Sequence, residues 1–136
     1  MKTITEVIAL FPDTKSEQWH QHENGKGWVF ETAFADLTSF VEGLVYGYAR
    51  VSGNAQVSGN AWAFSPLYIQ GTRHSVTLCS FTEIAIGCEV HSIVDWKKNY
   101  KTIGAKAGYT KTEIKEYGEY IAMLAKAAKR FKKAAK

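Results

Sequence analysis

Small and apolar residues recur every six positions through the middle of this chain. A six-residue step matches neither the two-residue period of a strand nor the period of about 3.6 residues of a helix. It is typical of a parallel β-helix, where short strands alternate with corners and small side chains point into a narrow interior. The residues that carry the repeat are Ala49, Ala55, Ala61, Val51, Val57 and Ala63.

Glycine and asparagine occupy positions between the repeated small residues. The dipeptides Gly53-Asn54 and Gly59-Asn60 are expected to form corners, because both residue types adopt positive φ at low cost. Upstream the six-residue step is weaker, and it slips between Val41 and Val45. We expect extra residues to bend or loop out there.

Short apolar alternations follow the repeat. They lie at residues 67–69, 76–78 and 84–86 and predict further strands in wider coils. The repeat region as a whole is therefore expected to form a β-solenoid over residues 28–90.

Residues 1–27 are expected to cap the first coil, because an open solenoid end exposes unpaired backbone and apolar interior. Alternation from Ile4 to Leu10 predicts a half-buried strand, which Pro12 ends. A turn signal, "NGKG" at residues 24–27, separates this cap from the repeat region.

Residues 91–136 follow a helical period instead of the repeat. Ser92 followed by Asp95 resembles a helix start, and Gly104 is expected to end this first helix. The sequence therefore predicts a C-terminal helical cap on a mainly β domain.

A second helix begins with a stronger signal. Thr110 and Glu113 have the spacing of a capping box. The apolar residues that follow are spaced three and four apart, as in a coiled-coil seam, although packing onto the protein's own body explains the same stripe. The seam consists of Ile114, Tyr117, Ile121, Leu124, Ala128 and Phe131, and its first four residues are the candidate oligomerisation contacts.

Composition fits one compact domain with a core, since 46% of the 136 residues are hydrophobic and 13% are aromatic. The sequence shows neither a secretion signal nor an apolar run long enough to cross a membrane, so a cytoplasmic protein is expected. Cys79 and Cys88 are too few for a disulfide scaffold. Free buried thiols are expected, with a single bridge as the alternative.

Charge divides the chain into two parts. Up to Trp96 there are five basic and ten acidic residues, whereas from Lys97 onward there are twelve basic and three acidic residues. Three explanations remain open: an acidic partner for the tail, attraction between two ends of an oligomer, or a solvated helical face.

The tandem "YARVSGNAQVSGNAWAF" at residues 48–64 resembles the hexapeptide-repeat, left-handed β-helix proteins, in particular the small ones found in tailed phages and prophages. The tract from Ser65 to Gly104 looks like the C-terminal portion attached to such repeats in phage proteins. The resemblance covers residues 28–104. It implies a short left-handed parallel β-helix capped by two helices, and a homotrimer that buries the flat solenoid faces.

Hexapeptide families include acyltransferases, which hold acyl-coenzyme A between neighbouring solenoids and use a loop histidine as general base. In this chain the resemblance points to His74 for that role, the only histidine within the expected coils. Residues 28–88 build little more than three coils, however, and no loop supplies a second catalytic group. We therefore assign no catalytic residue and no cofactor.

Four polar residues crowd together just after the repeat, and they are the candidate ligand-binding residues. An arginine, a histidine, a glutamine and a tyrosine can together hold a phosphate and stack against a base. Ordinary corner polarity is the alternative. The four residues are Tyr68, Gln70, Arg73 and His74.

Other clusters give weaker signals. His20, His22 and Glu23 have the smallest metal-ligand spacing, but a polar surface strand explains them equally, and no metal is assigned. The two cysteines with His91 could form a thiolate site, although cysteines in an apolar alternation usually behave as small buried hydrophobes.

The lysine-rich end of the chain does not indicate a nucleic-acid or membrane partner. Residues 126–136 offer a single aromatic residue, Phe131, and a single arginine, so they provide charge without base recognition. The segment is also too rich in alanine to bury much apolar area in a membrane.

Taken with the resemblance, these features favour a non-enzymatic, phage-type binding protein that counteracts host defence. It would sequester a signalling nucleotide at pockets between subunits or block a host defence protein. The alternative is a hexapeptide-repeat acyltransferase that uses acyl-coenzyme A. A structural phage component is the third hypothesis.

Overall fold

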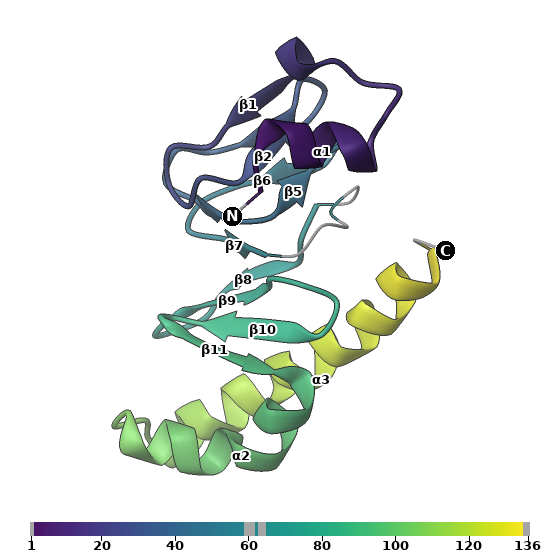
Figure 1. Cartoon of the computed structure of the whole chain (residues 1–136). Coiled ribbons are helices and arrows are strands. Elements are labelled where there is room, and N and C mark those ends of the chain that lie inside the picture. Colours follow the sequence, from purple (N-terminus) through teal and green to yellow (C-terminus); the bar gives the residue numbers. More distant parts are fainter. Residues whose placement is uncertain (1, 59–61, 63–64, 135–136) are drawn as a thin grey trace. The chain divides into compact units, whose positions relative to one another are not determined.

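The structure is a computed structural model that describes residues 2–58, 62 and 65–134 (Figure 1). The chain divides into two compact units, an N-terminal unit of residues 1–66 and a C-terminal unit of residues 67–136. Within the described ranges, no helix combines the length and the apolar character needed to span a membrane.

The N-terminal unit begins with helix α1 (Ile4–Leu10), where the alternation predicted a strand. The Thr3 hydroxyl accepts a hydrogen bond from the Glu6 N–H at 3.2 Å, and the Glu6 carboxylate accepts one from the Thr3 N–H at 3.1 Å. This capping box satisfies two backbone donors at the helix start. The strand prediction is therefore wrong, because the capped helix buries Val7, with Ile4 and Ile8 partly buried beside it, and leaves Leu10 51% exposed.

Helix α1 packs onto an aromatic cluster within its own unit. Val7, Trp19 and Leu44 are buried at the centre of this cluster. Phe11 lies beside the rings of Trp19 and Tyr46, at centroid distances of 5.3 and 4.7 Å. These contacts give the N-terminal unit its own core.

Within the described part of the N-terminal unit, seven short strands follow α1 and the 3-10 turn η1 (Ser16–Gln18). Strands β1 and β2 form an antiparallel hairpin, which confirms the turn predicted at residues 24–27. Three further pairs are parallel: β2 with β5, β3 with β6, and β4 with β7. The strands are β1 (Trp19–Gln21), β2 (Trp28–Phe30), β3 (Phe34–Ala35), β4 (Phe40–Val41), β5 (Leu44–Val45), β6 (Arg50–Val51) and β7 (Gln56–Val57).

Parallel partners lie 16 positions apart in sequence, as in the pairing of Phe34 with Arg50. The slip between Val41 and Val45 accounts for this offset, because β5 follows β4 by four positions while the neighbouring strands keep the six-residue step. The repeated residues Ala49 and Ala55 are buried, as their spacing predicted. The predicted corner Gly59-Asn60 and the repeat positions Ala61 and Ala63 lie outside the described residues.

The C-terminal unit begins with four antiparallel strands in the order β11-β10-β9-β8 (Figure 1). Connections of two to four residues join consecutive strands of this sheet. Connections this short make hairpins, whereas parallel neighbours need a crossover of about a dozen residues or more. The strands are β8 (Tyr68–Gln70), β9 (Ser75–Leu78), β10 (Glu83–Ile86) and β11 (Glu89–Ser92).

The predicted fold class, a continuous left-handed parallel β-helix over residues 28–90, is therefore wrong. Parallel pairing joins short strands between residues 28 and 57, apart from one bridge between Val45 and Trp62. The strands predicted at 67–69, 76–78 and 84–86 are present, but they pair antiparallel. The described chain combines several short mixed sheets with helices.

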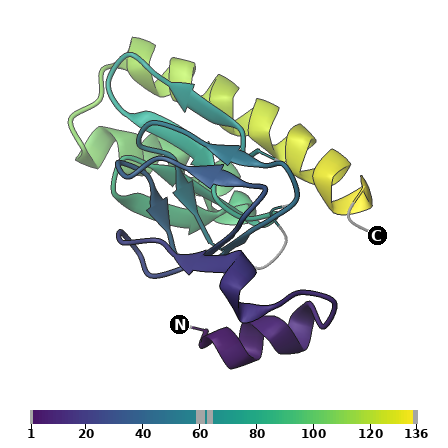
Figure 2. The same cartoon turned by 90° about the horizontal axis from the view of Figure 1, so that it is seen from above.

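Helices α2 (Ile93–Lys106) and α3 (Lys111–Ala134) complete the C-terminal unit, and both predicted starts are confirmed. Ser92 accepts a hydrogen bond from the Asp95 N–H at 3.1 Å. Helix α2 continues two residues beyond Gly104, and the chain then turns at Gly108, whose φ is +83°. Helix α3 continues unbroken to Ala134 (Figure 2).

Candidate ligand-binding pocket

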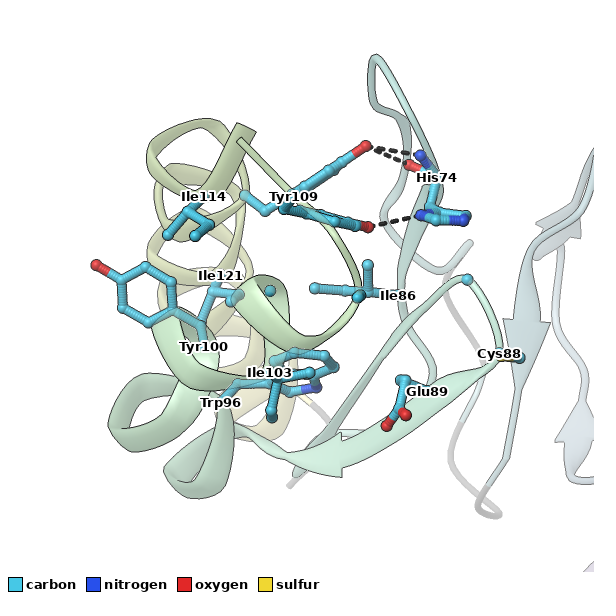
Figure 3. Close-up of a pocket in the computed structure, with 14 residues that line it drawn as sticks. His74, Ile86, Cys88, Glu89, Trp96, Tyr100, Ile103, Tyr109, Ile114 and Ile121 are labelled. Carbon is cyan, nitrogen blue, oxygen red and sulfur yellow. Dashed lines mark hydrogen bonds between the residues drawn. The ribbon is translucent and has the colours of Figure 1, made fainter. Parts of the chain in front are cut away.

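A pocket of about 190 Å³ lies within the C-terminal unit, between its sheet and its two helices. The lining is mainly apolar, as expected for a small-molecule site. Strand β10, helix α2 and helix α3 all contribute isoleucines to it (Figure 3). These are Ile86, Ile103, Ile114 and Ile121.

Trp96 forms one end of the pocket, together with Glu89 (Figure 3). The Trp96 side chain is buried, and its indole N–H donates to the Ile84 carbonyl at 2.8 Å. The His91 ring packs edge-on against it at a centroid distance of 4.9 Å. The indole is therefore held in place by the sheet.

Tyr117 of α3 fixes the loop between β8 and β9 at the other end. Its hydroxyl accepts hydrogen bonds from the backbone N–H groups of Arg73 at 2.8 Å and His74 at 2.7 Å. The same hydroxyl donates to the His74 carbonyl at 3.1 Å. One buried side chain thus sets the position of His74.

His74 faces Tyr109 at this end of the pocket (Figure 3). The His74 Nδ1 lies 2.6 Å from the Tyr109 hydroxyl oxygen, and the two rings stack with an interplanar angle of 13°. Burial raises the pKa of Tyr109 to about 12, and the nearby Tyr117 adds to the rise. The phenol therefore keeps its proton at neutral pH.

Arg73 is already engaged by protein groups. Its guanidinium donates to the Gly108 carbonyl at 2.9 Å and the Ala107 carbonyl at 3.4 Å, and it lies 3.3 Å from the Glu113 carboxylate. It also lies over the Tyr109 ring at 4.8 Å. These contacts hold the loop that connects α2 and α3. Arg73 does not line the pocket.

The turn between β10 and β11 supplies polar groups to the wall. Cys88 is an exposed free thiol, and Glu89 carries a carboxylate whose Oε2 lies 2.7 Å from His91 Nε2. Gly87 has a φ of +56°, and a β-carbon there would come within 3.1 Å of the His74 ring. Glycine therefore permits both the tight turn and the close approach of His74.

The structure separates the four residues of the sequence-based ligand cluster. Arg73 and His74 lie at one end of the pocket region, as described above. Tyr68 and Gln70 do not line it, and the Tyr68 hydroxyl donates to the Gln70 side-chain oxygen at 3.1 Å. Their role in ligand binding stays a prediction.

The candidate oligomerisation residues Ile114, Tyr117, Ile121 and Leu124 lie on the inner side of α3. Tyr117, Ile121 and Leu124 are buried, and Ile114 is half-buried. Three of the four line the pocket. Self-association through α3 stays a prediction, but packing within the chain already accounts for the stripe.

The described residues contain no group of three or more side chains that could hold a metal ion. His22 is buried, and backbone oxygens of Asn24 and Asp36 lie 2.9 and 2.8 Å from its two ring nitrogens. His20 is exposed on β1. His22 therefore serves the fold of the N-terminal unit.

Both cysteines are free, as the sequence predicted, but only Cys79 is buried. The expectation of a buried Cys88 is wrong, because this residue occupies the exposed two-residue turn between β10 and β11. The thiolate site with His91 gains no support, since the His91 ring contacts Glu89 and Trp96.

From the sequence, Tyr117 was assigned to oligomerisation and Tyr109 to no site. Four of the seven tyrosines lie between residues 100 and 120, and this concentration is the signal that could have pointed to a site containing both. The pair Gly87-Cys88 between two alternating segments was a hairpin signal. This hairpin signal could have placed Glu89 on a strand beside the helices.

Comparison of this chain with family models, with curated proteins and with solved structures finds no match.

Proposed function

We propose that this is a non-enzymatic binding protein whose C-terminal unit holds a small ligand with an apolar body. The observation that carries the proposal is the pocket of about 190 Å³ between the sheet and helices α2 and α3. An apolar cavity of about 150 Å³ is sufficient to bind benzene. The pocket therefore matches a single ring or a branched aliphatic group.

The chemistry of the pocket lining supports this proposal. Small-molecule sites combine an apolar lining with a few fixed polar groups at the rim. Here the isoleucines and Trp96 supply the apolar surface, while His74, Tyr109 and Glu89 supply polar groups whose positions are set by hydrogen bonds.

Two parts of the sequence-based hypotheses gain no support from this geometry. A nucleotide needs a cation for its phosphates, and the Arg73 guanidinium is engaged by two carbonyls and Glu113. The acyltransferase alternative required a long solenoid wall, which the short strands do not build. Trimer formation, phage origin and a role against host defence continue to rest on the resemblance alone.

A blocked pocket tests the proposal. Ile103→Trp adds a large side chain to the pocket lining, whereas Val94→Trp places the same residue at a position on α2 that is 74% exposed. We expect 2-phenylethanol to raise the melting temperature of the wild type and of Val94→Trp, because a ligand that binds the native state stabilises it. Ile103→Trp should lose the response. Equal responses in all three proteins would contradict the proposal.

A further inference from the structure

We propose that the pocket prefers ligands that carry a positively charged amine on their apolar body over neutral or anionic ligands of the same size. This inference rests on the proposed function, since it assumes that the pocket binds a small ligand. The observation that carries it is the placement of the Glu89 carboxylate beside the Trp96 ring at one end of a mainly apolar cavity.

Glu89 is the one acidic residue in the lining, and the lining includes neither lysine nor arginine, as judged from the described residues. Glu89 pairs with Ile86 across β10 and β11, so the two side chains lie on the same face of the sheet. The contact with His91 uses Oε2, which orients the carboxylate and leaves Oε1 for a ligand. A cationic group that enters here meets an opposite charge at the rim of an apolar surface, although water screens part of the attraction because the Glu89 side chain is 54% exposed.

An aromatic ring beside the carboxylate strengthens the same preference. Trp96 lines the pocket beside Glu89, whereas the Tyr109 ring at the other end already lies under the Arg73 guanidinium and stacks on His74. The face of a ring such as that of Trp96 attracts an ammonium group through its quadrupole. Trp96 is fixed by its hydrogen bond to the Ile84 carbonyl, so the ring need not be ordered when a ligand binds.

An anion finds no comparable partner in the lining. Arg73, the basic residue next to His74, directs its guanidinium toward Gly108, Ala107 and Glu113. The lysines of α2 and α3 are exposed and do not line the pocket. Salt screens such surface charges beyond about 8 Å at physiological ionic strength.

Protection of Cys88 from alkylation tests the inference on the full chain. Cys88 is exposed and lines the pocket, whereas Cys79 is buried, so iodoacetamide should label Cys88 first. Three probes share a phenyl ring and a two-carbon chain: 2-phenylethylamine, 2-phenylethanol and 3-phenylpropionate. Each protein is compared with and without probe, which removes any effect of a substitution on the intrinsic reactivity of the thiol.

We expect the amine to protect Cys88 at a concentration about three to five times lower than the alcohol, the difference expected for a partly exposed ion pair. The propionate should protect least. In Glu89→Gln, the amine should protect Cys88 only as well as the alcohol does. Protection by the alcohol should be unchanged. Glu119→Gln removes the same charge from an exposed position of α3 and should keep the preference.

The outcomes separate the two proposals. Equal protection by amine and alcohol, or a preference that survives in Glu89→Gln, would overturn the amine inference and leave the proposed function standing. Failure of all three probes to protect Cys88 would overturn the proposed function as well.

Discussion

The two units of this chain use different means to fill their interiors. In the N-terminal unit, parallel strands of two or three residues place small and β-branched side chains inside, and valines such as Val29, Val41 and Val57 are 0–1% exposed. In the C-terminal unit, an antiparallel sheet packs against two helices. Isoleucines from β10, α2 and α3 line a pocket between them.

The difference follows from the geometry of the elements. Strands that repeat at a fixed offset bring side chains of matched size into contact. The N-terminal unit nevertheless holds a hollow of about 190 Å³, which Phe11, Trp19, Phe30 and Tyr46 line. A helix pair against a short sheet leaves space where the turn between β10 and β11 approaches the helices. The two units therefore differ in the lining of their pockets rather than in pocket volume, and the proposed binding site belongs to the C-terminal unit.

The largest effect should come from truncating one apolar residue in each unit. Leu44→Ala removes a side chain that is 1% exposed in the N-terminal cluster, and we expect a loss of about 2–5 kcal/mol of unfolding free energy. Ile103→Ala, in the half-buried pocket wall, should cost clearly less, because the removed atoms face a cavity. Denaturant unfolding measures both, and equal losses would break the comparison.

Next in size is the loss of the Tyr117 hydroxyl. Tyr117→Phe leaves the backbone N–H groups of Arg73 and His74 without their acceptor, and we expect a loss of about 1–3 kcal/mol of unfolding free energy. The Tyr117 ring remains, so packing is preserved. An unchanged free energy of unfolding in chemical denaturation would show that the N–H groups of Arg73 and His74 find other acceptors.

The two capping boxes allow a matched comparison between units. Thr3→Ala and Thr110→Ala each remove the hydroxyl that accepts an N–H at 3.2 Å at a helix start. We expect each to cost about 1 kcal/mol of unfolding free energy. Both substitutions lie at exposed positions, so thermal unfolding should report the cap alone. A change above about 3 kcal/mol for Thr3→Ala would mean that loss of the cap also disturbs the packing of α1 on Trp19 and Leu44.

The last expected effect is confined to alkaline pH. The pKa of Tyr109 is raised to about 12 in the folded state, above the ordinary value of 10.0. Its contribution to stability is thus fully present below pH 10 and is lost as the pH rises toward 12, since the unfolded chain releases the proton first. In Tyr109→Phe, the free energy of unfolding should decrease less steeply between about pH 10 and pH 12. An identical pH dependence in both proteins would contradict the assignment.

Sequence analysis succeeded where a signal is local. The caps at Ser92 and Thr110 and the turn at 24–27 depend on side chains within a few residues of each other, and all are confirmed. The same logic was missed at Thr3 and Glu6, where an alternating pattern was given more weight than a capping box.

The topology and the pocket were harder to predict because they depend on contacts that are distant in sequence. The six-residue step identified buried small residues, but strand length and connection length decided how the strands pair. His74 was singled out from its neighbours in sequence, whereas its partners Tyr109 and Tyr117 lie 35 and 43 positions away. No periodicity in the sequence links these residues.

Methyl NMR of isoleucine-labelled protein titrated with 2-phenylethanol tests the central claim most directly. The account predicts shifts for Ile86, Ile103, Ile114 and Ile121, which line the pocket, while Ile4 and Ile8 of α1 stay unchanged. The absence of shifts at the four pocket isoleucines, or equal shifts in α1, would contradict it.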